Sequence, residues 1–335
     1  MLIIAEIGQA HEGSLGIAHS YIDALADTGV SAVKFQTHIA EAESSVQEPF
    51  RVKFSYEDSC RFEYWKRMEF TLEQWQGLKQ HCEDKGMEFI SSPFSNAAVD
   101  LLEKLGVKRY KIGSGEINNF LMLNKIASTG KNIILSSGMS SYLELDQTIS
   151  YLKNFDIDIS LLQCTTAYPT QPEQWGLNVI GEMKARYNVP VGFSDHSGDI
   201  FACLAAVVVG ASILEFHVVF DKRMFGPDAR ASLTISQVQQ LVEGVNQIHV
   251  AQKHQVNKDA ASSNFSSLKT IFEKSLAINS SMEEGSTITE EVLEAKKPKN
   301  EGVLAANYRD VLGKKLRKNK QKWDFIKWED FYEET

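Results

Sequence analysis

Short apolar runs rich in β-branched residues alternate with amphipathic helical stretches from residue 2 to about residue 250. Eight runs are typical of strands: Leu2–Ile7, Ala32–Gln36, Glu88–Ser92, Arg109–Gly113, Asn132–Ser136, Ser160–Thr165, Pro190–Phe193 and Ser212–His217. Helical periodicity follows in Ile17–Asp27, Leu72–Lys85, Ala97–Leu105, Leu121–Ser128, Tyr142–Leu152, Leu177–Tyr187, Ile200–Val209 and Ile235–Val250. Strict strand–helix alternation predicts a parallel sheet, and eight units in about 250 residues are typical of a (β/α)8 barrel.

A doubly wound sheet is the competing α/β architecture. It usually has fewer strands and a glycine-rich phosphate loop after the first one. Here residues 6–13 read EIGQAHEG, which does not match G-x-G-x-x-G. We therefore predict a TIM barrel over residues 1–252.

The pattern changes after the eighth unit. Residues 253–265 are polar and predict a linker. Residues 266–335 carry only short β-type runs, at Ser275–Ile278, Val292–Ala295 and Lys315–Arg317. A unit of this size with few large apolar side chains is marginal alone, so we expect it to pack against a barrel.

One connection inside the barrel is unusually long. Residues 37–71 lie between the second strand and the next helix and include Arg51, Tyr64 and Trp65. Long loops in compact domains are usually functional, and strand-to-helix loops build barrel active sites. We therefore expect this loop to take part in the function.

Composition excludes several classes of partner. The net charge of −9 disfavours nucleic acid or an anionic membrane surface as a partner. No apolar run approaches the roughly 18 residues of a membrane span, and the N-terminus lacks the pattern of a signal peptide. The four cysteines are scattered and form no C-x-x-C pair. We therefore expect a cytoplasmic protein.

Polar side chains gather at the carboxyl ends of nearly all the strands, where a barrel opens. Lys34 and Lys111 each interrupt an apolar strand, so their ammonium groups must face a cleft or a paired carboxylate. With the nearby hydroxyls of Ser92, Ser114, Ser136 and Ser194 they form a plausible cradle for a phosphate. The alternative is an internal Lys34–Glu6 or Lys111–Glu116 ion pair, and we favour the cradle.

Two histidines, His196 and His217, follow the seventh and eighth apolar runs. Each could be a hydrogen-bonded core histidine, or the two could form a proton relay. Two imidazoles on neighbouring strands, with Asp195 and Glu215 available to orient them, favour a divalent metal. Because only two nitrogen ligands are present, we expect an open, hydrated Mn²⁺ or Mg²⁺ site rather than a closed Zn²⁺ site.

These motifs together resemble the sialic acid synthase family, which condenses phosphoenolpyruvate with an N-acylated mannosamine-type sugar. The barrel segments that carry the resemblance are AEIG (5–8), VKFQT (33–37), SSPFS (91–95), KIGSGE (111–116), LSSGM (135–139), CTTAYP (164–169), GFSDHS (192–197), ILEFH (213–217) and GPD (226–228). In the tail, KSL (274–276), EGSTIT (284–289) and KPKN (297–300) resemble the family's small antifreeze-protein-like C-terminal domain.

The resemblance implies a role for each matching residue. His196 and His217 would hold the metal that polarises the open-chain sugar's aldehyde. The phosphoenolpyruvate pocket would comprise Lys34, Gln36, Ser92, Lys111, Ser114, Ser136 and Ser194. Glu6, Tyr168 and Asp228 would face the sugar, and the catalytic residues would be Glu6, Glu116, Lys111 and His217.

The tail of the family also implies a partner subunit. Lys297 stands where the family often has an arginine that reaches across a dimer to the sugar's N-acyl group. The resemblance therefore implies a domain-swapped homodimer in which Lys297 helps to bind the sugar.

Three functions are compared on these features. The first is a nonulosonic acid synthase that makes N-acetylneuraminate or, alternatively, legionaminate or pseudaminate from a 2,4-diacetamido-2,4,6-trideoxyhexose. The second is another 2-keto-3-deoxy sugar acid synthase, which needs a second phosphate site that Arg51, Lys53, Arg61, Lys66 and Arg67 could supply. The third is a non-catalytic sugar-binding protein, which the histidine pair, both lysines and Glu116 disfavour.

Overall fold

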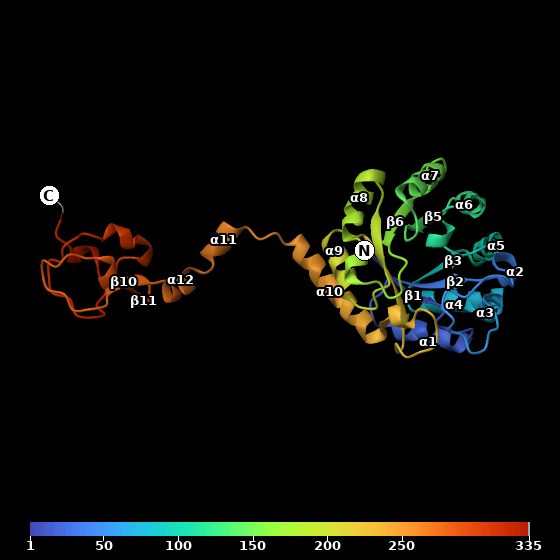
Figure 1. Cartoon of the computed structure of the whole chain (residues 1–335), viewed down its shortest axis with the longest axis horizontal. Helices are drawn as coiled ribbons and strands as arrows, with labels where there is room; N and C mark the ends of the chain where they lie inside the picture. Colours follow the sequence, from blue (N-terminus) through green and yellow to red (C-terminus); the bar gives the residue numbers. More distant parts are fainter. Residues whose placement is uncertain (334–335) are drawn as a thin grey trace. The chain divides into compact units, whose positions relative to one another are not determined.

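The chain divides into two compact units, Met1–Lys253 and His254–Thr335 (Figure 1). The computed structural model describes residues 1–333. The boundary falls at the end of a long helix, α10 (Ile235–Lys253). The segment 253–265, expected to be a linker, holds the short helix α11 (Lys258–Ser263). A second short helix, α12 (Ser266–Phe272), follows it.

The first unit is a barrel of eight parallel strands. In chain order these are β1 (Leu2–Gly8), β2 (Ala32–Thr37), β3 (Glu88–Pro93), β4 (Arg109–Ile112), β5 (Asn132–Ser136), β6 (Ile159–Cys164), β7 (Val191–Asp195) and β8 (Ile213–Val219). The hydrogen-bonded order is β3-β2-β1-β8-β7-β6-β5-β4, with the two-residue β9 (Leu233–Thr234) attached to β8. The end strands β3 and β4 lie against each other, and the Arg109 guanidinium bonds both carboxylate oxygens of Glu88 across them.

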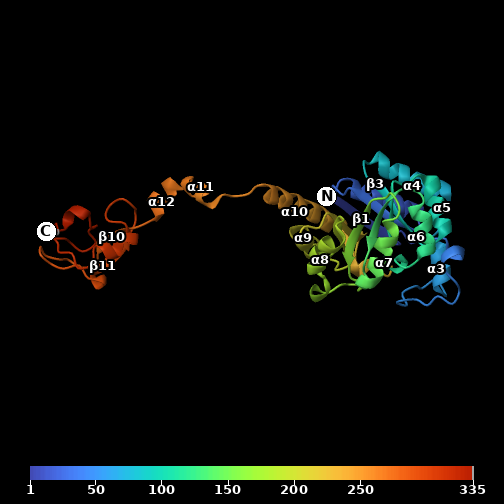
Figure 2. The ribbon, with the colours of Figure 1, turned by 90° about the horizontal axis from the view of Figure 1, so that it is seen from above.

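Helices surround these strands in both views (Figures 1 and 2). The helices of the eight units are α1 (Leu15–Ala26), α4 (Leu72–Asp84), α5 (Asn96–Leu105), α6 (Phe120–Ala127), α7 (Tyr142–Leu152), α8 (Leu177–Tyr187), α9 (Phe201–Val208) and α10. The predicted TIM barrel is therefore confirmed, with strand and helix boundaries within about three residues of the predictions. Side-chain caps fix several starts: Thr71 and Ser141 each form a capping box before α4 and α7.

The core has two layers. A large cluster fills the space between the sheet and the helices. A smaller cluster inside the barrel comprises Ile4, Ala32, Ile90, Ile134, Leu162 and Ile213. Gly192 belongs to the same interior, because a Cβ there would lie 2.4 Å from the Ile213 carbonyl oxygen. The interior is thus packed with side chains, which leaves the polar carboxyl ends of the strands to form the open mouth.

The long loop 37–71 has structure of its own. It contains α2 (Ala40–Glu43) and α3 (Arg61–Met68). Ala40, Tyr64, Trp65 and Met68 form a separate buried cluster under this loop. The loop is therefore a packed cover beside the barrel mouth rather than a bare connection.

The second unit has a small core of its own. Its hairpin joins β10 (Ser275–Ile278) to β11 (Leu293–Lys296), and Leu276, Ile288, Val303, Leu316 and Ile326 pack around it. The strand expected at 315–317 is reduced to single bridges, Thr287 to Lys315 and Leu316 to Phe331.

Candidate active site

A cavity of about 440 Å³ opens at the carboxyl ends of the barrel strands. It is lined by residues from the strand tips and by loop 37–71. The structure brings nearly all the expected site residues to it: Glu6, Lys34, Gln36, Ser92, Lys111, Ser114, Glu116, Ser136, Tyr168, Ser194, His196, His217 and Asp228. Lys297 belongs to the second unit, where its ammonium lies 4.8 Å from the Phe272 ring centroid.

Two buried lysines and two buried carboxylates occupy the floor of this cavity. Lys34 forms an ion pair with Glu6, and the Lys111 ammonium lies 3.3 Å from Glu215 Oε1. None of the four is more than 6% exposed. The Lys34–Glu6 pair that the sequence left open is present, whereas the alternative Lys111–Glu116 pair is wrong, because Lys111 turns toward Glu215 on β8.

Hydroxyl groups complete the surroundings of the lysines. Lys111 Nζ donates to Ser136 Oγ at 2.6 Å, and Lys34 Nζ donates to Ser92 Oγ at 3.3 Å. Ser194 Oγ donates to Glu215 Oε1 at 3.2 Å. These short hydroxyl side chains leave room above the ammonium groups, as binding of an anion requires.

Lys34, Lys111 and Glu215 affect one another's pKa values. Burial alone would raise the pKa of Glu215, but Lys111 and Lys34 outweigh it and lower this pKa to about 2. Burial lowers the pKa of Lys111, with Lys34 adding to the effect and Glu215 opposing it. Burial alone would lower the pKa of Lys34, but Glu215 and Glu6 outweigh burial and raise this pKa above its ordinary value. The floor therefore places two lysines and two carboxylates in close contact.

Glu116 is less buried than these four groups and carries different electrostatics. It lies in the 3-10 turn Ser114–Glu116 and accepts a 2.7 Å hydrogen bond from Asn119 Nδ2. Burial raises its pKa, and the Asn119 hydrogen bond opposes that shift only in part. A carboxyl group with a raised pKa at a cavity wall is suited to exchange protons with a ligand.

His196 and His217 lie side by side, with ring centroids 5.3 Å apart. Burial is the main cause that lowers the pKa of His196 to about 3, and His217 adds to it. His196 Nδ1 lies 3.2 Å from the Thr165 carbonyl oxygen, so Nδ1–H donates there and Nε2 keeps its lone pair. A neutral imidazole with a free Nε2 fits a metal ligand.

Within residues 1–333 no group of three or more His, Cys, Asp or Glu side chains is arranged to hold a metal ion. One further observation favours a ligand nearby: Glu215 Oε2 is buried and has no hydrogen-bond partner in the described chain.

The expected orienting carboxylates are not where the sequence analysis put them. Asp195 accepts from Ser197 N and Oγ, at 3.0 and 2.8 Å. Glu215 bonds Lys111 and Ser194. Neither carboxylate is hydrogen-bonded to an imidazole in the described residues, and the orienting partner of His196 is instead a backbone carbonyl.

An arginine from the long loop joins two of the expected sugar-facing residues. Arg51 Nη2 lies 2.9 Å from Asp228 Oδ1, and its guanidinium carbon lies 4.2 Å above the Tyr168 ring centroid. Tyr168 in turn packs against His196, with centroids 4.2 Å apart. The sequence pointed to loop 37–71 as a whole but could not show which side chain enters the cavity.

The sequence also missed His38 and its neighbours. His38 is buried between Trp65 of α3 and Phe94, with both rings stacked on it. Gln9 and Cys164 line the same cavity. Cys164 lies in the CTTAYP segment but was given no role, and no motif marked Gln9 or His38. The surroundings of His38 depend on the folding of loop 37–71, which supplies Trp65.

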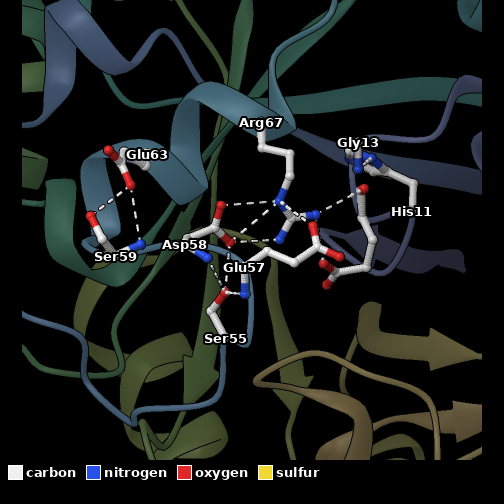
Figure 3. A network of polar contacts seen from close by, with 9 residues as sticks. His11, Gly13, Ser55, Glu57, Asp58, Ser59, Glu63 and Arg67 are labelled. Atoms are coloured by element: carbon white, nitrogen blue, oxygen red, sulfur yellow. Dashed lines mark hydrogen bonds and ion pairs between the residues drawn. The ribbon is translucent and has the colours of Figure 1, made fainter.

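Arg67 fastens the long loop to the loop after β1 (Figure 3). Its guanidinium bonds both carboxylate oxygens of Asp58, with Nη2 to Oδ2 at 2.8 Å. It also bonds the carbonyl and carboxylate oxygens of Glu12, each at 3.1 Å. Gly13 belongs to this junction, because a Cβ there would lie 2.3 Å from the Arg67 carbonyl oxygen.

The chain is similar to a known family and to several named enzymes. A model described as the NeuB family matches residues 21–257. The N,N'-diacetyllegionaminic acid synthase of Campylobacter jejuni is 36% identical over 97% of this chain and 98% of its own length. The human N-acetylneuraminate-9-phosphate synthase is 36% identical over 74% of this chain and 70% of its own length.

A solved structure agrees with these similarities. The N-acetylneuraminic acid (sialic acid) synthetase of Leptospira borgpetersenii, crystallised with citrate, superposes with a TM-score of 0.70 at 31% identity. The match covers 80% of this chain and 92% of that one. In residues 1–333, no helix combines the length and apolar character needed to cross a membrane.

The junction at Arg67 predicts a pH-dependent contribution to stability from Glu12. Burial, partly opposed by Arg67, raises the pKa of Glu12 from 4.5 to about 7. The folded protein therefore keeps a proton that the unfolded chain loses near pH 4.5, so ionisation of Glu12 favours unfolding as the pH rises from 4.5 through 7. As the pH rises over that range, the free energy of unfolding of the wild type should fall relative to that of Glu12→Gln.

Urea unfolding at pH 5, 6, 7 and 8 measures this difference. Glu57→Gln is the matched control, because Glu57 faces the same Arg67 at 3.8 Å but its side chain is 75% exposed. A difference between wild type and Glu12→Gln that stays constant with pH would contradict the prediction.

Proposed function

The chain belongs to the NeuB family of phosphoenolpyruvate-dependent condensing enzymes, and we propose that it joins phosphoenolpyruvate to the aldehyde of an open-chain N-acyl hexosamine. The products would be a nonulosonic acid and phosphate. The observation that carries the proposal is the buried Lys34–Glu6 and Lys111–Glu215 group at the floor of the cavity. Buried ammonium groups next to hydroxyl groups, at the open end of the barrel, can form charge-assisted hydrogen bonds with a small polyanion.

In this proposal phosphoenolpyruvate lies above the two lysines. Lys111 with Ser136 and Lys34 with Ser92 would bind its phosphate and carboxylate oxygens, which would compete with Glu215 and Glu6 for the ammonium groups. Ser114 and Ser194 also line the cavity and would contribute further hydrogen bonds. Binding through groups already fixed by the strands limits the ordering needed at each turnover.

The condensation would form one carbon–carbon bond and then release phosphate. C3 of the enol forms the new bond to the aldehyde carbon, and water adds to the resulting cation at C2. The tetrahedral intermediate then loses phosphate by cleavage of the C2–O bond. Glu116, with its raised pKa, would give or take protons beside these carbons.

A divalent metal, Mn²⁺ or Mg²⁺, would be held by His196 and His217 and would supply Lewis acidity toward the aldehyde oxygen. Two observations support a metal at these residues. His196 donates through Nδ1, which leaves its Nε2 lone pair free, and the His217 ring lies beside it. The remaining coordination positions would be left to water and substrate, since the described chain supplies no third side-chain ligand.

The acceptor is best understood as an unphosphorylated sugar. The loop cations that could have formed a second phosphate site are largely neutralised: Arg51 by Asp228, Arg61 by Glu48 and Arg67 by Asp58 and Glu12. Lys66 faces Glu41, and Lys53 is exposed and does not line the cavity. This charge pairing supports a nonulosonic acid synthase over the phosphosugar-dependent alternative.

Two acceptors fit this proposal, and they differ at C4 and C6. N-acetylmannosamine would give N-acetylneuraminate, whereas a 2,4-diacetamido-2,4,6-trideoxyhexose would give a legionaminate- or pseudaminate-type acid. The whole-length similarity to a diacetyllegionaminic acid synthase favours the second acceptor. Glu6, Tyr168, Asp228 and Arg51 would face whichever sugar binds.

We also propose that the second unit is antifreeze-protein-like and acts in a homodimer, with Lys297 reaching the sugar bound to the partner. The apolar side chains exposed along and beside α12, Phe265, Leu268, Ile271 and Phe272, support a further contact surface. If sedimentation equilibrium shows a monomer at a concentration at which the enzyme is fully active, this assembly is wrong. The cytoplasmic location stays a prediction.

The substrate assignment predicts acceptor-dependent phosphate release. Phosphoenolpyruvate should be stable with the enzyme alone and should release phosphate when the correct hexosamine is added. A panel of N-acetylmannosamine, its 6-phosphate and 2,4-diacetamido-2,4,6-trideoxyhexoses, with mass detection of the product, tests this. Release with the 6-phosphate alone would contradict the neutral-acceptor proposal, and no release with any sugar would contradict the enzyme class.

The metal assignment predicts that chelation and loss of an imidazole have the same effect. EDTA should abolish turnover, and added Mn²⁺ or Mg²⁺ should restore it. His217→Ala should lower kcat at least about 100-fold and weaken Mn²⁺ binding measured directly by calorimetry. His249→Ala, on α10 outside the cavity, is the control, and full activity of His217→Ala would remove His217 from the site.

A further inference from the structure

We propose that His38, held by Glu43, is a positioning residue that fixes the side-chain amide of Gln36 against Glu6 and thereby controls binding of the acceptor sugar. This inference deepens the proposed function and rests on it for the identity of the acceptor. The hydrogen bonds and the packing around His38 carry it.

His38 is held rigidly on both faces and at one edge. Its ring stacks on Trp65 at 4.0 Å between centroids and on Phe94 at 4.7 Å, with interplanar angles of 14° and 7°. Its Nδ1 lies 2.6 Å from Glu43 Oε1, so Nδ1–H donates to that carboxylate. Both side chains are buried, with 2% and 6% exposed for His38 and Glu43. The two stacked rings and the hydrogen bond to Glu43 therefore fix the orientation of the imidazole and the direction in which its Nε2 points.

That Nε2 edge faces the two glutamines. Nε2 lies 3.1 Å from Gln9 Nε2 and 3.3 Å from Gln36 Oε1. Gln9 Nε2 donates to Gln36 Oε1 as well. When the ring is neutral, Gln9 donates to both acceptors; when it is protonated, His38 itself donates to Gln36 Oε1. In either state the carbonyl oxygen of Gln36 is the group that is held.

The orientation of the Gln36 amide follows from this contact. With its oxygen bound, its Nε2 must point the other way, and it donates to Glu6 Oε1 at 2.9 Å. A second N–H on the same nitrogen is left for a ligand, since Gln36 lines the cavity. An N–H donor beside a carboxylate oxygen matches a sugar hydroxyl, which accepts from one and donates to the other.

The position of this pair points to the acceptor rather than to phosphoenolpyruvate. At Gly8 (φ +53°) a Cβ would lie 3.2 Å from Glu6 Oε1, 3.5 Å from Gln36 Nε2 and 3.5 Å from His217 Cε1. Glu6 and Gln36 therefore converge beside His217, where the aldehyde would bind. The Lys111–Ser136 part of the phosphate cradle is built instead from β4 and β5.

Substituting His38 by Phe removes the ring nitrogens but keeps an aromatic ring between Trp65 and Phe94. In His38→Phe the acceptor KM should rise about tenfold or more, the effect of losing one positioning hydrogen bond, whereas the KM for phosphoenolpyruvate should change less than about threefold. His38→Gln, whose amide reaches the former Nε2 position, should recover most of the acceptor affinity. His81→Phe is the matched control, because His81 bonds His19 and Asp23 between α1 and α4.

A double-mutant cycle separates positioning from simple packing. His38→Phe and Gln9→Leu both release Gln36 Oε1, so the effect of the double variant on acceptor KM should be clearly smaller than the product of the single effects. Multiplicative effects, or an equal rise in both KM values, would overturn the proposal. Thermal melting of each variant identifies any that fail to fold.

One readout needs no substrate and separates this inference from the proposed function. Nitrogen-15 NMR of the histidine side chains, with the His38 signal assigned by its loss in His38→Phe, should show Nδ1 protonated. A ring protonated only at Nε2 would overturn the inference even if the enzyme turns over. If NMR shows that Nδ1 is protonated but no sugar supports turnover, the proposed function is wrong. The hydrogen bonds from Glu43 through His38 to Gln36 are then still supported.

Discussion

The buried charges at the floor of the barrel are the interaction on which the rest of the site depends. Glu6 and Lys34 are paired across β1 and β2 by the register of the sheet, and Glu215 stands on β8, on the other side of β1. A buried charge that loses its partner costs about 3–5 kcal/mol. The four groups therefore constrain one another's positions at the floor of the cavity.

This constraint also explains how the cavity treats an anion. Two lysines stand against two carboxylates, so in the proposed function the floor would bind phosphoenolpyruvate through hydrogen-bond geometry and local charge rather than through excess positive charge. In the proposed function, a divalent cation held by His196 and His217 would add positive charge. The net charge of −9 for the whole chain makes such local compensation necessary.

The sequence predicted the barrel well because its signals are local. Each strand is a short apolar run with a polar tip, and caps such as Thr71 and Ser141 mark helix starts within a few residues. The same strand ends predicted Lys34, Lys111, His196 and His217 at one mouth, because parallel strands must end on the same side.

The sequence failed where a contact joins distant segments. The only ion-pair partner that it offered for Lys111, as an alternative to the phosphate cradle, was the nearby Glu116, whereas the barrel brings Glu215 from four strands later. It expected carboxylates behind the imidazoles, but the backbone carbonyl of Thr165 takes that place for His196. Arg51 and His38 reach the cavity through the tertiary packing of loop 37–71, which no periodicity or motif encodes.

The central claim is that the paired lysines bind phosphoenolpyruvate, and its affinity for wild type and Lys111→Met tests this most directly. Titration calorimetry should show binding at least about 100-fold weaker in Lys111→Met, which keeps the packed stem and removes the charge-assisted hydrogen bonds. Lys125→Met, which removes a surface partner of Asp100, should bind as the wild type does. Equal affinity of wild type and Lys111→Met would contradict the account.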